Sequence, residues 1–214
     1  MEYETLRKQV VDAGLKMFRM GMTHGTSGNI SCRVLDKEKM LITPSNISYE
    51  EIKTKDIILV NFAGEAEETG RNPSSETPFH LAIYKNRGDV NGIVHSHSVY
   101  ALAVATSGKT VPVFLDEMFS DIGGEILVAD YALPGSEELA SNVLAKLGDK
   151  NAVLLANHGA ACCGKNLKEA FHLAETVEKI CRVFVLSSIL CEVKPLPADG
   201  IDYQRMMYEM KKEF

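Results

Sequence analysis

The sequence lacks an excess of positive charge. It has 23 lysines and arginines against 29 aspartates and glutamates, a formal net charge of −6 at pH 7. Proteins that bind nucleic acid usually present a basic surface, so this balance predicts no nucleic-acid partner. It also means that any anionic ligand must be held by local geometry rather than by a general positive field.

Cys-x-x-Cys motifs and long apolar runs are also missing. The five cysteines include the adjacent Cys162 and Cys163 but no Cys-x-x-Cys, a usage that predicts reduced thiols in a cytoplasmic protein. The longest apolar stretch, near Val183 to Cys191, is too short and too polar to cross a bilayer, and the charged start of the chain does not resemble a signal peptide. We therefore expect a cytoplasmic location and no membrane partner.

No repeat, low-complexity tract or break in composition divides the chain. The shares of hydrophobic residues (45%) and charged residues (24%) are ordinary for a globular protein. A chain of 214 residues can bury a sizeable core. We therefore expect one domain that spans residues 1–214.

Apolar periodicity and turn residues predict alternating helices and strands. The expected helices cover about residues 4–20, 77–85, 100–105, 136–147, 167–188 and 202–213, with a further short helix opened by the capping box Ser48-x-x-Glu51. The expected strands cover about residues 30–34, 40–42, 57–61, 90–95, 126–129 and 152–156. This alternation predicts an α/β fold in which a central sheet is covered on both faces.

Four residues in separate stretches can form a metal site. The apolar run from Val90 ends in His95-x-His97, and alternate side chains of a strand share a face, roughly 6.6 Å apart. His158 follows a second apolar run and can reach the same point if the two strands lie near each other, and Glu76 can add a carboxylate oxygen. Three nitrogens and one oxygen suit zinc, with iron, cobalt or manganese as alternatives. A lone buried histidine is more often a hydrogen-bonded core residue, so this prediction needs all four donors to meet.

Three turns rich in hydroxyl groups can bind an anion. They are Gly25–Ser31, Thr43–Asn46 and Pro73–Ser75. The first can present backbone N–H groups, Asn46 tolerates a left-handed backbone, and the third precedes a helix whose N-terminus favours negative charge. Ordinary tight turns and plain N-capping explain the same residues, and the sequence does not show whether the three turns converge.

Taken in order, these motifs resemble the class II aldolases of the L-fuculose-phosphate aldolase type. The matching motifs are Gly25-Thr-Ser-Gly-Asn-Ile-Ser31, Thr43-Pro-Ser45, Pro73-Ser-Ser-Glu76, Val94-His-Ser-His97 and Asn157-His-Gly159. The same group includes ribulose-5-phosphate 4-epimerases and methylthioribulose-1-phosphate dehydratases. The resemblance runs from the first helix to about residue 188, and five motifs in order are specific although each is weak alone.

The resemblance implies a fold, an assembly and a set of site residues. The fold is a three-layer α/β/α sandwich with a mixed, largely antiparallel central sheet, and the assembly is a homotetramer with active sites at subunit interfaces. A zinc ion, or another divalent metal, would be held by Glu76, His95, His97 and His158. The phosphate of a small phosphorylated sugar would be bound by Thr26, Gly28, Asn29, Ser45, Asn46, Ser74 and Ser75.

The implied reaction is retro-aldol cleavage of a ketose phosphate, similar to L-fuculose 1-phosphate, to dihydroxyacetone phosphate and an aldehyde. Cleavage needs a group that stabilises the developing enediolate, and no lysine lies in a predicted pocket motif to form a Schiff base. The metal is therefore the expected Lewis acid, and the family suggests that Glu76 moves a proton at the adjacent carbon. Dehydration, 4-epimerisation or decarboxylation of a sugar phosphate at the same site are alternatives, as is a non-catalytic domain that resembles the adducin head.

The chain departs from the aldolase pattern at two places. Asn46 stands where a glycine usually follows the hydroxyl residue, a change of small expected effect. No tyrosine lies between residues 100 and 131, where fuculose-phosphate aldolases offer a proton donor to the neighbouring subunit. The dehydratases instead carry a Glu-Met pair there, which Glu117 and Met118 match, but they lack the glutamate that Glu76 matches. Glu117 is therefore our first candidate for a second proton-transfer residue, and the other candidates are Asp116, Tyr203 and Tyr208.

Overall fold

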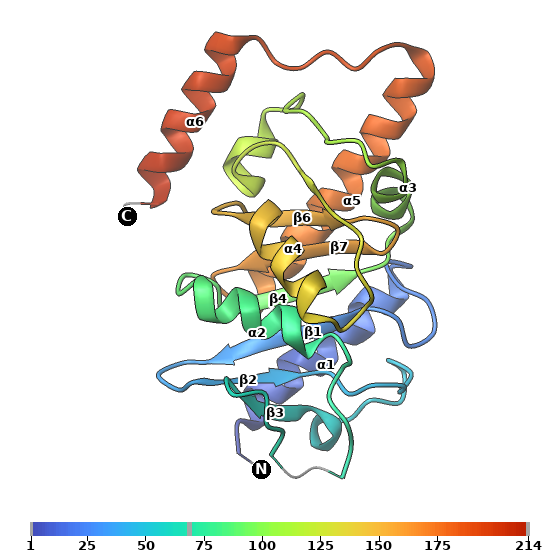
Figure 1. Cartoon of the computed structure of the whole chain (residues 1–214), viewed down its shortest axis with the longest axis vertical. Helices are drawn as coiled ribbons and strands as arrows, with labels where there is room; N and C mark the ends of the chain where they lie inside the picture. The colour runs from blue at the N-terminus through green and yellow to red at the C-terminus, as the bar shows by residue number, and fades with distance from the viewer. Residues whose placement is uncertain (1, 68–69, 213–214) are drawn as a thin grey trace.

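The computed structural model describes residues 2–67 and 70–212, and within them one seven-stranded sheet runs through the molecule in the order β3-β2-β1-β4-β7-β6-β5 (Figure 1). The strands are β1 (Asn29–Val34), β2 (Lys39–Ile42), β3 (Ile58–Asn61), β4 (Gly92–Ser96), β5 (Val128–Ala129), β6 (Ala152–Leu155) and β7 (Gly159–Gly164). Neighbouring strands pair antiparallel except β5 and β6, which run parallel. The expected mixed, largely antiparallel sheet is confirmed.

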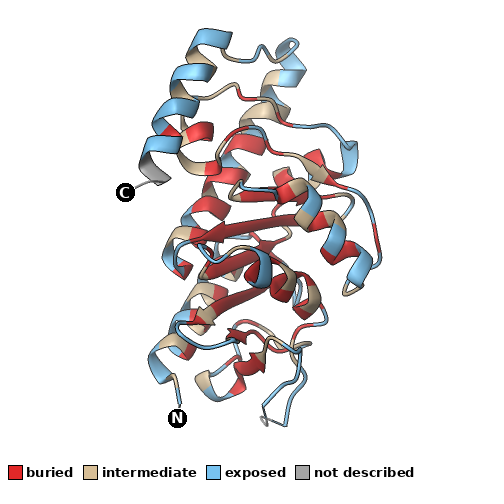
Figure 2. Cartoon of the chain, turned by 60° about the vertical axis from the view of Figure 1, so that its left-hand side comes forward, coloured by how far each residue is buried: buried red, intermediate tan, exposed pale blue. Residues whose placement is uncertain are grey.

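Helices cover both faces of the sheet and complete three layers. On one face lie α1 (Glu4–Arg19), α3 (Val99–Ser107) and α5 (Leu167–Leu190), and on the other lie α2 (Thr77–Asn86) and α4 (Glu137–Leu147), both in front of the sheet in Figure 1. Strand residues alternate between the two apolar cores, as Val94 and Ile93 of β4 do. The strands are almost wholly buried (Figure 2), and the α/β/α sandwich is confirmed.

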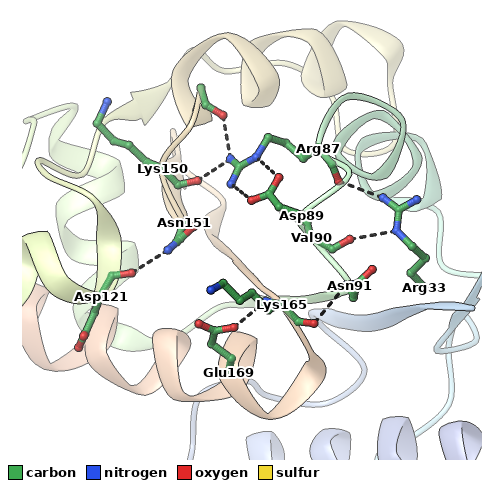
Figure 3. A network of polar contacts seen from close by, with 11 residues as sticks. Arg33, Arg87, Asp89, Val90, Asn91, Asp121, Lys150, Asn151, Lys165 and Glu169 are labelled. Atoms are coloured by element: carbon green, nitrogen blue, oxygen red, sulfur yellow. Dashed lines mark hydrogen bonds and ion pairs between the residues drawn. The ribbon is translucent and has the colours of Figure 1, made fainter. Parts of the chain in front are cut away.

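Two arginines fix the C-terminal end of α2 against the sheet (Figure 3). Arg33 on β1 donates to the carbonyl oxygens of Tyr84 and Val90, at 2.5 and 3.0 Å. Arg87, just after α2, makes a two-pronged contact with Asp89 and donates to two carbonyl groups in the turn before β6, each at 2.9 Å. Since helix and strand ends are tied together here, the opposite end of α2 has a fixed position over the sheet.

The prediction of a short helix at the capping box Ser48-x-x-Glu51 is wrong. Residues 48–52 form a turn closed by a 2.9 Å bond from the Glu51 N–H to the Ser48 carbonyl. The chain is extended at Lys53 (φ −116°, ψ 163°), so the turn cannot propagate. A 3₁₀ turn at Thr54–Asp56 follows instead.

The last helix, α6 (Ala198–Lys212), lies away from the sheet and packs near the π-helical turn Met118–Ile122 (Figure 1). It was expected over residues 202–213, of which residue 213 lies outside the described part. Much of its surface is exposed (Figure 2), but Tyr208 is buried against Gly123. Among the described residues, no helix is long and apolar enough to cross a membrane.

Candidate active site

Three segments deliver Glu76, His95, His97 and His158 to one edge of the sheet. Glu76 is the residue before α2, His95 belongs to β4, His97 follows β4, and His158 lies in the turn between β6 and β7. Because β4 and β6 are both antiparallel to β7, they are parallel to each other, and their C-terminal ends lie at the same edge. This topology explains how a histidine so late in the chain reaches the other three donors.

One donor atom from each of these four residues lies within 4.8 Å of the others. His95 Nε2 is 3.0 Å from both His97 Nε2 and Glu76 Oε2, and His158 Nε2 is 3.1 Å from Glu76 Oε1. The planes of the three imidazole rings are nearly perpendicular to one another, with angles of 73° to 79°. The ring edges therefore converge on one small volume.

Close backbone packing fixes this geometry. A Cβ atom at Gly159 would lie 2.4 Å from the Ser96 carbonyl oxygen and 3.1 and 3.2 Å from ring atoms of His97 and His95. At Gly28, where φ is +73°, a Cβ atom would lie 2.7 Å from the His95 carbonyl oxygen. Only glycine fits at either position without movement of the histidine strand.

The electrostatics of the cluster favour a bound cation. Burial on its own would raise the pKa of Glu76, but the facing imidazoles of His95 and His158 hold it below its ordinary range. Burial opposes the charged form of His95 as well, yet the Glu76 carboxylate raises its pKa. Burial and the two other imidazoles lower the pKa of His97 to about 3. A buried carboxylate of this kind needs a compensating positive charge.

The donor atoms fit a divalent metal. His95 Nδ1 lies 3.0 Å from the Ala160 carbonyl oxygen, and since a carbonyl only accepts, Nδ1 carries the proton and Nε2 directs its lone pair into the cluster. Glu76 Oε1 is buried and accepts no hydrogen bond among the described residues. Three imidazole nitrogens and one carboxylate oxygen suit a metal of the zinc type.

The three hydroxyl-rich turns lie side by side next to this cluster. Thr43 exchanges backbone hydrogen bonds with Ile30 and Ser74, and the Ser45 N–H bonds the carbonyl of Asn72. Together with Glu76, His97 and His158 they line a cavity of about 310 Å³. Its walls contain Thr26, Ser27, Gly28, Asn29, Pro44, Ser45, Asn46, Ser74, Ser75, Glu76, His97, Pro134 and His158. No lysine or arginine is among these residues, as the sequence led us to expect.

Individual residues of the turns have different environments. Asn46 has a left-handed backbone (φ +58°), as expected. Ser75 is exposed, whereas the Ser45 hydroxyl donates to the Pro73 carbonyl at 2.7 Å. The side-chain amide of Asn29 donates from Nδ2 to Glu76 Oε2 at 2.8 Å, and its oxygen lies 2.5 Å from Nε2 of His80. Asn29 therefore lines the cavity but directs its side-chain donor at the carboxylate.

The candidates for the second proton-transfer residue do not line this cavity. Glu117 precedes the π-helical turn, and its carboxylate lies 2.7 Å from Lys179 Nζ on α5. Asp116 and Tyr203 are exposed, and Tyr208 is buried in the core.

Sequence reasoning missed His80 and Pro134. His80 is fully buried beside Asn29. Its position four residues after Glu76 places it one helical turn further on the same face of α2, and this spacing is the signal that could have found it. Pro134 shows no such signal.

Comparison with known proteins agrees with this geometry over nearly the whole chain. The sequence pattern described as Class II Aldolase and Adducin N-terminal domain matches residues 8–185. The chain is 36% identical over 199 residues to the L-fuculose phosphate aldolase of Escherichia coli K12 (93% of this chain, 91% of the relative). It is 36% identical over 203 residues to the 5-deoxy-D-ribulose 1-phosphate aldolase of Bacillus thuringiensis (95% of each). A solved L-fuculose 1-phosphate aldolase superimposes with a TM-score of 0.92 at 33% identity and 98% coverage of both chains. The chain therefore belongs to the class II aldolase and adducin N-terminal domain family, as an enzyme of the lyase class with a Glu/His₃ metal centre.

Proposed function

We propose that the protein cleaves a small ketose 1-phosphate by a metal-dependent retro-aldol reaction to dihydroxyacetone phosphate and an aldehyde. The observation that carries this proposal is the shared cavity: Glu76, His97 and His158 of the Glu/His₃ cluster line one hollow of about 310 Å³ together with the three hydroxyl-rich turns. A ligand with a phosphate at one end and adjacent carbonyl and hydroxyl oxygens at the other matches such a site. L-Fuculose 1-phosphate and 5-deoxyribulose 1-phosphate are the first compounds to test.

The turns would hold the phosphate without a basic side chain. Ser75 is exposed at the start of α2, where the free N–H groups and the helix dipole favour an anion. Thr26 and Gly28 from the first turn, Ser45 and Asn46 from the second, and Ser74 and Ser75 from the third are the proposed donors. Asn29 completes the set, although its side chain acts mainly on Glu76.

Zinc would be held by Glu76, His95, His97 and His158, and when bound it supplies Lewis-acid stabilisation of the negative charge that develops on the substrate oxygens. In the cleavage direction Glu76 would react as the neutral acid. It would deliver its proton to the carbon next to the carbonyl once the carbon–carbon bond has broken, and the carboxylate left behind would take up a proton from solvent after product release. In the reverse direction Glu76 removes that proton, as microscopic reversibility requires. Burial of Glu76 and His95 limits the access of water to this carbon.

A second group must accept the proton of the hydroxyl that becomes the aldehyde. Glu117, which lies 2.7 Å from Lys179 Nζ of its own chain, would do this from a neighbouring subunit of a homotetramer. Two features support the contribution of another chain. Glu117 does not line the cavity of its own chain, and apolar side chains near the site are uncovered: Val99, two residues after His97, is 56% exposed, and Leu133, next to Pro134, is 69% exposed.

Dehydration, 4-epimerisation and decarboxylation of a sugar phosphate are second candidates because each can use the same enediolate-forming site. The Glu117-Met118 pair favours the dehydratase among them. An adducin-head-like structural role does not require four metal-binding donors, and this chain keeps all four in contact. Their convergence favours catalysis.

The test is an assay of zinc-loaded protein with a panel of ketose 1-phosphates, in which dihydroxyacetone phosphate is detected by a coupled NADH-linked reduction. We expect release of this triose phosphate from at least one ketose 1-phosphate, and none with His97→Ala. The unphosphorylated ketoses should not be cleaved, as judged by the absence of dihydroxyacetone. Formation of a dehydrated or epimerised product without triose phosphate would overturn the retro-aldol proposal. Metal analysis of the purified protein would identify the native ion.

A further inference from the structure

A buried chain of hydrogen bonds leads from Glu76 away from the cavity into the core. Asn29 Nδ2 lies 2.8 Å from Glu76 Oε2, and Asn29 Oδ1 lies 2.5 Å from His80 Nε2. His80 Nδ1 is 2.7 Å from Ser31 Oγ, which is 2.9 Å from the hydroxyl of Tyr84. All five residues are buried, and His80 and Ser31 are fully so.

This series of hydrogen bonds runs through the otherwise apolar layer between the sheet and α2. Asn29 and Ser31 are alternate residues of β1 and so lie on one face of it, while His80 and Tyr84 are one turn apart on α2. Their neighbours in this layer include Phe79, Ile83 and Ile93. A polar group in such surroundings is costly unless it is fully hydrogen-bonded, so an apolar residue at position 80 would be the simpler choice for stability alone.

The chemistry of the groups fixes the direction of every bond. The ionised Glu76 can only accept, so the Asn29 amide must present its N–H₂ to the carboxylate and its oxygen to His80. His80 must then donate from Nε2, which leaves Nδ1 unprotonated as an acceptor. Ser31 accordingly donates to Nδ1 and accepts from the Tyr84 hydroxyl. A single tautomer of His80 satisfies all five groups.

We propose that His80 is a positioning residue for the metal centre: as the Nε2–H tautomer it locks the amide orientation of Asn29, which in turn holds Glu76 Oε2 and leaves Oε1 available to the metal. The opposite orientation of the Asn29 amide would direct an oxygen at the carboxylate and push Glu76 out of the cluster. Burial, together with the charge of nearby His95, lowers the pKa of His80 to about 3, which is consistent with a neutral ring at physiological pH. The role of Glu76 rests on the proposed function, but the orientation of its carboxylate does not.

Two measurements on the zinc-loaded protein test this assignment directly. ¹⁵N NMR of histidine-labelled protein should show His80 with a protonated Nε2 and an unprotonated Nδ1 between about pH 6 and pH 8, the range in which an ordinary histidine titrates. Zinc affinity, measured by competition with a chromophoric chelator, should fall roughly 10- to 100-fold in His80→Phe, the scale found for outer partners of metal ligands. His80→Gln keeps an amide N–H near the position of Nε2 and should restore most of the affinity.

Tyr84→Phe is the matched control, because it removes a hydroxyl from the far end of the same series of hydrogen bonds and leaves Ser31 able to donate to His80. We expect zinc affinity within about threefold of wild type, since only one hydrogen bond remote from Glu76 is lost. In assays with an active ketose phosphate, His80→Phe should lower kcat with little change in KM, because Asn29 is the one proposed phosphate-binding residue that His80 contacts.

A protonated or Nδ1–H ring in the NMR spectrum would overturn the proposal, as would His80→Phe and Tyr84→Phe proteins with equal zinc affinity. If His80→Phe does not fold, the wild-type NMR spectrum and the zinc affinity of His80→Gln test the proposal. A His80→Gln protein that binds zinc as weakly as an Asn29→Leu protein would overturn it. Absence of retro-aldol activity with every substrate would refute the proposed function and leave the tautomer and affinity results intact.

Discussion

Replacement of Gly159 by alanine should damage the metal centre more than the fold. The new Cβ atom would lie 2.4 Å from the Ser96 carbonyl oxygen and within 3.2 Å of both neighbouring histidine rings. Real Cβ atoms do not approach closer than 3.0 Å, so the two backbones must separate by roughly 0.6 Å or more, whereas metal–ligand distances tolerate only about 0.2 Å. We therefore expect the variant to lose good contact with at least one imidazole.

The expected size of the effect can be separated into two parts. Overpacking in a buried region costs about 1–3 kcal/mol in the metal-free protein, or roughly 2–4 °C in Tm per kcal/mol for a chain of this size. Metal at 1,000 times Kd adds about 4.1 kcal/mol to the wild type, and a 100-fold weaker site at the same concentration adds only about 1.4 kcal/mol. The zinc-induced rise in Tm should therefore shrink to about one third.

The assay is thermal unfolding by calorimetry with and without zinc. Gly88→Ala is the matched control, because its Cβ would meet no atom within 4 Å, and it should keep the full zinc-induced rise. If Gly159→Ala shows a lower Tm without zinc but the same zinc-induced rise as wild type, the close approach of Ser96 and Gly159 does not set the histidine geometry, and the reasoning is refuted.

Four further changes test other parts of the site. His97→Ala should remove bound metal and activity together, and near-full metal content by atomic absorption would contradict the proposed ligand set. Ser75→Ala should raise KM for the phosphorylated substrate by roughly 10- to 150-fold, since a hydrogen bond to a charged group contributes about 1.5–3 kcal/mol; an unchanged KM would remove Ser75 from the phosphate site. Glu117→Gln should lower kcat by roughly 10²- to 10⁴-fold with metal content retained, and activity within a few-fold of wild type, with Asp116→Asn inactive, would move the role to Asp116. The pKa of His80 is lowered to about 3 in the native state. Below the ordinary histidine pKa near 6.5, the unfolded chain therefore binds a proton that the native protein does not, and the free energy of unfolding decreases as the pH is lowered. This loss is about 2 kcal/mol between pH 7 and pH 5, and urea unfolding of His80→Gln should show a smaller pH dependence by that amount.

Local patterns in the sequence predicted the layers and the four donors because each depends on short-range geometry. The alternation of Ile93 and Val94 follows from the period of a strand, and the His-x-His motif places two rings together for the same reason. The left-handed turn at Asn46 was predictable because few residues tolerate that backbone. The capping box at Ser48 misled, since local preference for a helix was overridden by the extended path of Lys53 toward β3.

Features that depend on distant segments could not be predicted. The three turns converge because Thr43 bonds to both Ile30 and Ser74 across the sheet edge, a pairing that no single window of sequence contains. His80 lies in a helix whose pattern indicates only a buried face, and its partners come from β1. Glu117 does not line the cavity of its own chain, and in the proposed assembly its place would be set by subunit packing, which no local sequence pattern specifies.

The central place of β7 has a consequence for the order of assembly during synthesis. Glu76, His95 and His97 leave the ribosome together, but His158 is positioned only when β7 inserts between β4 and β6. At normal elongation rates the stretch from His97 to Gly164 takes on the order of several seconds to translate, and pairing between such distant segments is slow because of the entropy of loop closure. The nascent chain therefore passes through a period in which three of the four donors are present without the scaffold that sets their spacing. Binding of a metal by all four donors would accordingly have to follow the pairing of β7 with β4 and β6.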